Sequence, residues 1–231
     1  ILLSRLGPQW MNGAMLGGLT SFLMVSFFIG LIGYITALTA QYLGAERKAY
    51  CSVVVVQGLL IAVAAYPLIL AAQPLAYGFF QAMNLDEEQV AAARGYFDIL
   101  VYGSLIVLVR SCLSSFFSGV GRTRVVMAAS LLAMTVNVLA SYILIFGKFG
   151  FPVMGIKGAA LGSVFGSLCG VLMMVLFYFQ RGYRKEFNIM HSFVFDREVM
   201  KKLLRFGYPT GIEMFFSVLA FDVLVMVFHS S

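Results

Sequence analysis

The chain has 231 residues, of which 61% are apolar and only 11% charged, and its mean hydropathy is +0.94. A soluble domain carries roughly a quarter charged residues, so this composition excludes a soluble globular protein and predicts an all-α polytopic membrane protein. The net charge of +6 would suit a nucleic-acid surface, but the basic residues lie in alternate connections between apolar segments. That pattern indicates membrane topology, and we expect a monomer in the lipid bilayer, without a nucleic-acid partner or a cofactor.

Six apolar segments are each long enough to cross a bilayer, which takes about 20 residues. In chain order they cover residues 12–43, 51–83, 91–118, 125–147, 156–180 and 206–229. The chain begins without Met and stops directly after the last of these segments. We therefore expect a fragment of a longer protein that lacks an upstream helix.

The connections at 44–48, 119–124 and 181–205 carry most of the basic residues, which predicts that they lie in the cytoplasm and that the protein is a multi-pass protein of the plasma (inner) membrane. From Asp196, a plausible N-cap, apolar and basic residues alternate with helical spacing, which predicts an amphipathic helix on the inner leaflet. Three parts follow: an N-terminal lobe at 1–185, a cytoplasmic linker helix at 186–205, and the first helix of a C-terminal lobe at 206–231.

Polar and small side chains recur on single faces of three spans. They are Ser26, Gly30, Tyr34, Ala37 and Gln41 in the first span, Ser130, Asn137 and Ser141 in the fourth, and Gly158, Gly162, Gly166 and Gly170 in the fifth. The glycines predict close packing of another helix. The two polar stripes fit either interhelical hydrogen bonding or the lining of a cavity.

Two acids lie deep in the sixth span, Glu213 and Asp222. Each costs about 2.5–3.5 kcal/mol on insertion scales, which favours a role such as binding a cation or a proton over simple burial among neighbouring helices. Nine residues of ideal helix turn through about 900°, so the two carboxylates are expected on opposite faces. In the third span, Arg94 and Asp98 are spaced for an ion pair, and Arg110 is expected to extend its charge toward water.

Four stretches give the chain a resemblance to the multidrug and toxic compound extrusion (MATE) family of the MOP flippase superfamily. They read TALTAQYLGAERKA (36–49), SSFFSGVGRTR (114–124), NVLASYILIFGKFGFPVMGIKGAALGS (137–163) and LLRFGYPTGIEMFFSVLAF (203–221). They are collinear with the second to seventh helices of that family. The resemblance implies a twelve-helix fold of two lobes, of which this chain holds about half.

The resemblance also implies a cation site in the N-terminal lobe. Asn137 matches an asparagine of that site, whereas the usual aspartate one turn later is Ser141 and the usual threonine is Ser163. In the seventh helix the acid of bacterial members falls at Ser217, with Glu213 one turn earlier and Asp222 where some members carry a second acid. The coupling role then shifts toward Glu213 and Asp222, while Asn137, Ser141 and Gln41 line the N-lobe cavity with sodium possible near Asn137 and Ser141.

The implied activity is secondary active efflux, not enzymatic catalysis. Alternating access would export small, amphipathic organic cations in exchange for protons or sodium ions. An alternative from the same superfamily is a lipid-linked oligosaccharide flippase, which would need several deep basic residues, and only Arg110 is a candidate. A channel would need a ring of polar residues, and a membrane enzyme would need clustered metal or catalytic ligands, whereas His191 and His229 are predicted at opposite membrane surfaces.

Overall fold

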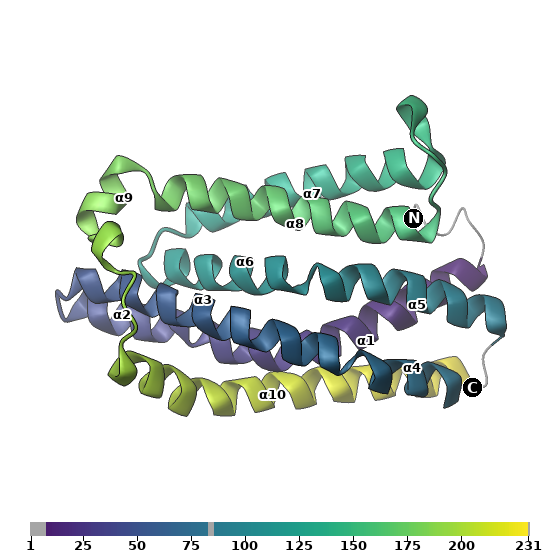
Figure 1. Cartoon of the computed structure of the whole chain (residues 1–231), viewed down its shortest axis with the longest axis horizontal. Helices are drawn as coiled ribbons and strands as arrows, with labels where there is room; N and C mark the ends of the chain where they lie inside the picture. Colours follow the sequence, from purple (N-terminus) through teal and green to yellow (C-terminus); the bar gives the residue numbers. More distant parts are fainter. Residues whose placement is uncertain (1–7, 83–85, 231) are drawn as a thin grey trace.

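The computed structural model describes residues 8–82 and 86–230, and this part of the chain is helical with short connections. Figure 1 shows α7 and α8 along one side of the bundle, α10 along the opposite side, and α1 to α6 between them. Some of our expectations fall outside the described part of the chain: the segment ends at residues 1, 83 and 231, and the position of the His229 side chain. The helices are α1 Pro8–Gly33, α2 Ile35–Gly44, α3 Lys48–Ala71, α4 Gln73–Ala82, α5 Glu87–Tyr102, α6 Ser104–Gly119, α7 Thr123–Phe146, α8 Ile156–Tyr178, α9 Arg181–Glu186 and α10 Arg197–Ser230, with 3₁₀ turns η2 Lys148–Gly150 and η3 Ile189–His191.

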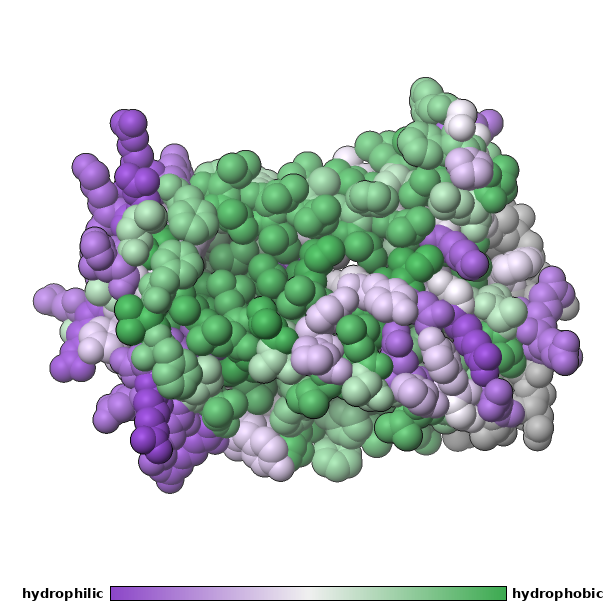
Figure 2. Space-filling model, viewed as in Figure 1, coloured by the Kyte–Doolittle hydropathy of each residue, from purple (hydrophilic) through white to green (hydrophobic). Residues whose placement is uncertain are grey.

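Five helical stretches are long and apolar enough to cross a membrane, and they match five of the six predicted spans. The remaining predicted span corresponds to the pair α5 and α6, which are bent by 47° relative to each other and are long and apolar enough only when taken together. The bend falls at Gly103 and Ser104, a residue pair at which helices commonly kink. A side chain at Gly103 would lie 2.6 Å from Val164 Cγ2, so this glycine also allows α8 to approach. A broad hydrophobic band crosses the middle of the molecule, as expected for a surface that faces lipid (Figure 2).

The predicted glycine ridge on α8 packs against α7. A Cβ at Gly158 would lie 2.7 Å from the carbonyl carbon of Leu144, and one at Gly166 would lie 2.5 Å from the carbonyl oxygen of Ala133. Lipid chains are as apolar as leucine, so helices in a membrane gain contact mainly through such close backbone approach. The ridge therefore fixes the α7–α8 pair.

Basic connections meet at one end of the bundle, which we call the basic end: the α2–α3 turn, the α6–α7 turn and α9 (Figure 1). Hydrophilic residues are concentrated there (Figure 2). Lys48 Nζ and Glu186 Oε1 form an ion pair of 2.9 Å across this end, joining the start of α3 to α9.

The segment at 187–195, which we call the strap, folds back onto the bundle. Ser52 Oγ donates a 2.7 Å hydrogen bond to the Phe187 carbonyl, and Gln57 Nε2 donates a 2.9 Å bond to the Val194 carbonyl. The Phe187 ring packs edge-to-face on Phe116, and Ile189 is fully buried. Two buried polar side chains of α3 thus donate hydrogen bonds to carbonyls of the strap.

Asp196 caps α10, as predicted: its Oδ1 accepts hydrogen bonds from the backbone amides of Glu198 and Val199, at 2.9 and 3.0 Å. The amphipathic pattern is present too, since Val199 and Leu203 are buried. We expected a linker helix that ends near residue 205, separate from the last span. The structure instead shows one continuous helix of 34 residues, which runs through Pro209 although the proline nitrogen cannot donate to the Arg205 carbonyl.

Candidate functional site

Asp222 is a buried carboxylate in the α10 span. Its side chain is 3% exposed, and its Oδ1 atom has no hydrogen-bond partner among the described residues. An ionised carboxylate in such surroundings is costly unless a cation or a proton neutralises it. The position is therefore chemically suited to hold a positive charge.

The α1–α10 interface explains why Asp222 is buried. A Cβ at Gly207 would lie 2.6 Å from the carbonyl oxygen of Leu31, and one at Gly211 would lie 2.7 Å from that of Phe27, so the two helices run antiparallel in close contact. Asp222 follows Gly211 by eleven residues, which rotates the helix to within about 20° of the same face. The carboxylate thus continues the face of α10 that packs on α1.

Glu213 points elsewhere. Its side chain is exposed, as are those of Ser217 and Ala220 on the same face of α10. The opposite orientation of Glu213 and Asp222 agrees with the rotation of nine helical residues. The two carboxylates therefore belong to different environments, one in the α1–α10 interface and one on the surface of this half of the fold.

The asparagine of the fourth span joins α7 to α8. Asn137 Nδ2 donates a 2.9 Å hydrogen bond to Ser163 Oγ, which in turn donates a 3.1 Å bond to the Ala159 carbonyl. Ser141 is 6% exposed and lies against Gly162, whose missing side chain makes room for it. The glycine ridge thus brings Asn137, Ser141 and Ser163 to one stretch of the α7–α8 interface.

Tyr96 of α5 joins this cluster, and the sequence reasoning missed it. Its hydroxyl lies near Ser163, and its ring is 3.5 Å from where a Cβ at Gly18 of α1 would be. A single tyrosine in an apolar span usually packs in the core, so only the partner on α8 marks it as part of a polar cluster. The cluster therefore joins α5, α7 and α8 beside α1.

Gln41 does not join them. It is exposed on α2, near the basic end, and α2 packs on α3 and α6. The small residues of its stripe instead serve the α10 contact: Gly30 packs against Thr210 and Gly211, and the Tyr34 ring stacks on Phe206 at 5.7 Å. Most of this stripe is a helix-packing surface.

The predicted ion pair between Arg94 and Asp98 is wrong, since the ion pair between described residues is Lys48–Glu186. Tyr77 of α4 takes both partners: its hydroxyl donates a 2.6 Å hydrogen bond to Asp98 Oδ1, and the Arg94 guanidinium lies 5.1 Å from the centre of its ring. Contacts with Tyr77 on a neighbouring helix thus take the place of the ion pair that we predicted within one helix.

Arg110 is half-buried between α6 and α7. Its Nη2 donates a 3.2 Å hydrogen bond to Ser130 Oγ, and its Nε is 3.7 Å from where a Cβ at Gly170 would be. Among the described side chains, no three His, Cys, Asp or Glu come together as a metal site.

A family model described as MatE matches residues 1–143, more than half of the chain. The chain belongs to the MATE family. This match contains Asn137 and Ser141, and it ends before Ser163 and the two acids of α10. MATE proteins are transporters and not enzymes.

Relatives in bacteria extend the MATE likeness to the whole chain. The chain is 29% identical to the probable multidrug resistance protein NorM of Bacillus subtilis (strain 168), with all of this chain and 52% of that protein aligned. It is 33% identical to the probable multidrug resistance protein NorM of Thermotoga maritima over 57% of this chain and 28% of that protein. The chain spans about half the length of the relatives that it matches end to end.

Solved structures share the fold. A multidrug resistance MATE family transporter of the MOP superfamily aligns in its inward-facing conformation with a TM-score of 0.83 and 22% identity, over 95% of this chain and 49% of that one. Its outward-facing conformation aligns with the same TM-score and identity, over 98% and 49%. The helices described here thus form half of a MATE fold.

Proposed function

We propose that the protein to which this chain belongs is a secondary active antiporter that exports small, amphipathic organic cations in exchange for protons or sodium ions. The multidrug resistance names of the bacterial relatives support this proposal, as does the MATE fold. Residues 1–185 would form the N-terminal lobe, 186–205 the linker, and 206–231 the start of a C-terminal lobe. The protein would act as a monomer in the plasma (inner) membrane, with its basic end in the cytoplasm.

The observation that carries the proposal is the buried Asp222 carboxylate with an unpartnered oxygen. Such a group has two states that differ by a full charge. When ionised it attracts a cation, and when a proton or a sodium ion neutralises it, that attraction is lost. Because a ligand shifts a conformational equilibrium only through different affinities for the two states, neutralisation at the α1–α10 interface would favour one helix arrangement over the other.

Glu213 has a separate role in this scheme. It is exposed with Ser217 on the face of α10 opposite to Asp222. We assign Glu213 to the side that meets the organic cation and Asp222 to the coupling ion. The two sites would then communicate through the same rigid helix, without a direct contact between the carboxylates.

The Asn137 cluster would add polarity to the N-terminal lobe. Because Asn137 Nδ2 donates to Ser163, Oδ1 is the atom of this amide that can coordinate a cation. Together with the hydroxyls of Ser141, Ser163 and Tyr96 it would offer oxygen ligands, which sodium as a hard cation prefers. None of these four side chains brings a negative charge, so we propose that the site is weak and assists Asp222.

The test is transport of a fluorescent organic cation by the full-length protein reconstituted in liposomes with an imposed proton or sodium gradient. Asp222→Asn and Glu213→Gln should each lower the initial rate about tenfold or more, a size typical of lost coupling between sites. Glu88→Gln, which changes an exposed acid at the start of α5, is the control and should transport normally. Normal transport by both Asp222→Asn and Glu213→Gln would contradict the proposal.

The two roles predict different defects. Asp222→Asn should abolish the dependence of efflux on the ion gradient, while retaining binding of the organic cation. Glu213→Gln should weaken binding of that cation, while retaining the response to the gradient. The reverse pattern of defects would place the organic cation at Asp222 and the coupling ion at Glu213.

The flippase alternative has less support. A pyrophosphate needs several converging cations. Arg110 lies deep in its span, but its Nη2 is engaged by Ser130 and its Nε lies beside Gly170. These contacts favour a packing role for Arg110 between α6, α7 and α8.

A further inference from the structure

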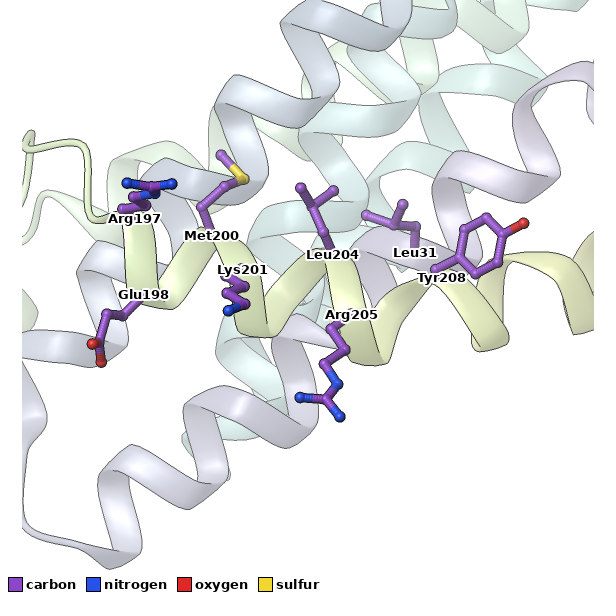
Figure 3. A pocket seen from close by; sticks show the side chains of 8 residues that line it. All are labelled: Leu31, Arg197, Glu198, Met200, Lys201, Leu204, Arg205 and Tyr208. Carbon is purple, nitrogen blue, oxygen red and sulfur yellow. The ribbon is translucent and has the colours of Figure 1, made fainter.

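A groove with a volume of about 840 Å³ lies at the basic end, between α1 and the first three turns of α10 (Figure 3). Three cations line it, Arg197, Lys201 and Arg205, spaced four residues apart on one face of α10. Figure 3 shows Lys201 and Arg205 projecting from the same side of the helix. Its apolar lining includes Leu31 of α1 with Leu204 and Tyr208 of α10.

The charge of the groove is strongly positive. Arg197, Lys201 and Arg205 are exposed, and none of them takes part in the ion pair that the described residues form, which is Lys48–Glu186. Glu198 is the acid in the lining, so the four charged side chains sum to +3 − 1 = +2. These guanidinium and ammonium groups present donors suited to an anionic group such as a phosphodiester.

Charged and apolar side chains lie next to one another along the α10 side of the groove, with Met200 and Leu204 between the three cations. The cations occupy residues 197–205, about 12 Å of helix, and the apolar lining continues to Tyr208. Leu204 and Tyr208 are 44% and 56% exposed, so the apolar side of the groove is open. The apolar lining thus extends about one turn beyond the last cation, away from the basic end, which suits an amphiphile whose headgroup lies at the basic end.

We propose that the groove binds an anionic phospholipid, with its phosphodiester headgroup at Arg197, Lys201 and Arg205 and an acyl chain along Leu31, Leu204 and Tyr208. Basic residues gather on the side of bacterial membrane proteins that faces the cytoplasm, where the leaflet offers anionic headgroups. A soluble phosphate would use the cations but leave the apolar lining wet. The bound lipid would hold the start of α10 at the membrane surface, whatever compound the transporter carries.

The experiment uses the full-length protein in detergent, titrated with phosphatidylglycerol or with phosphatidylcholine and read out by native mass spectrometry. The wild type should bind phosphatidylglycerol preferentially. The triple variant R197Q/K201Q/R205Q should lose affinity for it on the order of 100-fold, because each basic side chain near an anionic surface contributes about 1 kcal/mol. Phosphatidylcholine binding should stay unchanged.

A matched variant, R181Q/R184Q/K185Q, removes three exposed cations from α9 at the same end of the bundle. It should retain phosphatidylglycerol binding, and so should R197K/K201R/R205K, which keeps the charges. An equal loss of phosphatidylglycerol affinity in the α9 variant would overturn the proposal. So would a wild type that does not prefer phosphatidylglycerol, a result that is also expected if the rest of the protein fills the groove. Displacement of the lipid by millimolar inorganic phosphate would show a free-anion site instead. Equal melting temperatures of all variants without added lipid verify that they are folded.

Discussion

Asn137 Nδ2 donates a 2.9 Å hydrogen bond to Ser163 Oγ and thereby links the middle of α7 to the first half of α8. Around this bond the two helices are in backbone contact, since Gly162 and Gly166 leave room for Ser141 and Ala133. The same close approach that packs the helices therefore also places the polar atoms in reach of one another.

This bond should be measurable as a coupling energy. Asn137→Ala, Ser163→Ala and the double variant form a double-mutant cycle, and we expect an interaction of about 0.6–1.7 kcal/mol, the range found for hydrogen bonds between membrane helices. The readout is the free energy of unfolding of the full-length protein in detergent. Strictly additive effects would mean that the side chains do not interact. Ser217→Ala, at an exposed position of α10, serves as the neutral control.

Close packing on α8 predicts an intolerance of even one methyl group. Gly166→Ala would place a Cβ 2.5 Å from the Ala133 carbonyl oxygen. We expect it to destabilise the protein by about 1–3 kcal/mol, the usual cost of overpacking. Gly78→Ala on α4, where nothing lies within 4 Å, should be neutral or stabilise by up to about 1 kcal/mol, because alanine favours the helix. Similar melting temperatures for the two variants would contradict the close contact.

The start of α10 depends on its N-cap. Asp196→Ala removes the acceptor of two backbone amides and should cost about 0.5–2 kcal/mol, whereas Asp196→Asn keeps an acceptor and should cost much less. Thermal unfolding of the three proteins gives the comparison. If alanine and asparagine have the same effect, the cap does not stabilise the helix.

The strap should be held by its buried hydrogen bonds more than by its ion pair. Ser52→Ala leaves the Phe187 carbonyl without its partner, at a cost of about 1–3 kcal/mol for a buried group. Lys48→Gln breaks the 2.9 Å pair with Glu186, which is partly exposed, and such pairs contribute about 0–1 kcal/mol. Limited proteolysis within 187–195 should therefore accelerate strongly in Ser52→Ala and little in Lys48→Gln. The opposite order would show that charge holds the strap.

Length and hydropathy were sufficient to predict the six spans, because the bilayer requires about 20 apolar residues whatever the packing. The α8 glycines and the opposite faces of Glu213 and Asp222 were also predictable, since both follow from helical periodicity. The bend between α5 and α6 was not predicted, because Gly103 within an apolar segment is equally compatible with a straight helix.

Cross-helix contacts account for the errors. Arg94 and Asp98 have the spacing of an ion pair, but Tyr77 on another helix offers a better arrangement for both. Gln57 donates to the Val194 carbonyl, and Tyr96 lies near Ser163. Both neighbours are more than 60 residues away in the sequence, so the pattern within a single span does not predict them. The continuity of α10 was missed because its polar first turns were assigned to a connection.

Gln57 and Ser52 donate hydrogen bonds to strap carbonyls that lie 137 and 135 residues further along the chain. Contacts of such separation form late, since the loop between them must first be closed. The strap contacts both α3 and α6, so its full set of contacts requires these two helices to be packed together. Docking buries Phe187 and Ile189, so an undocked strap would expose two large apolar side chains at the basic end of the bundle.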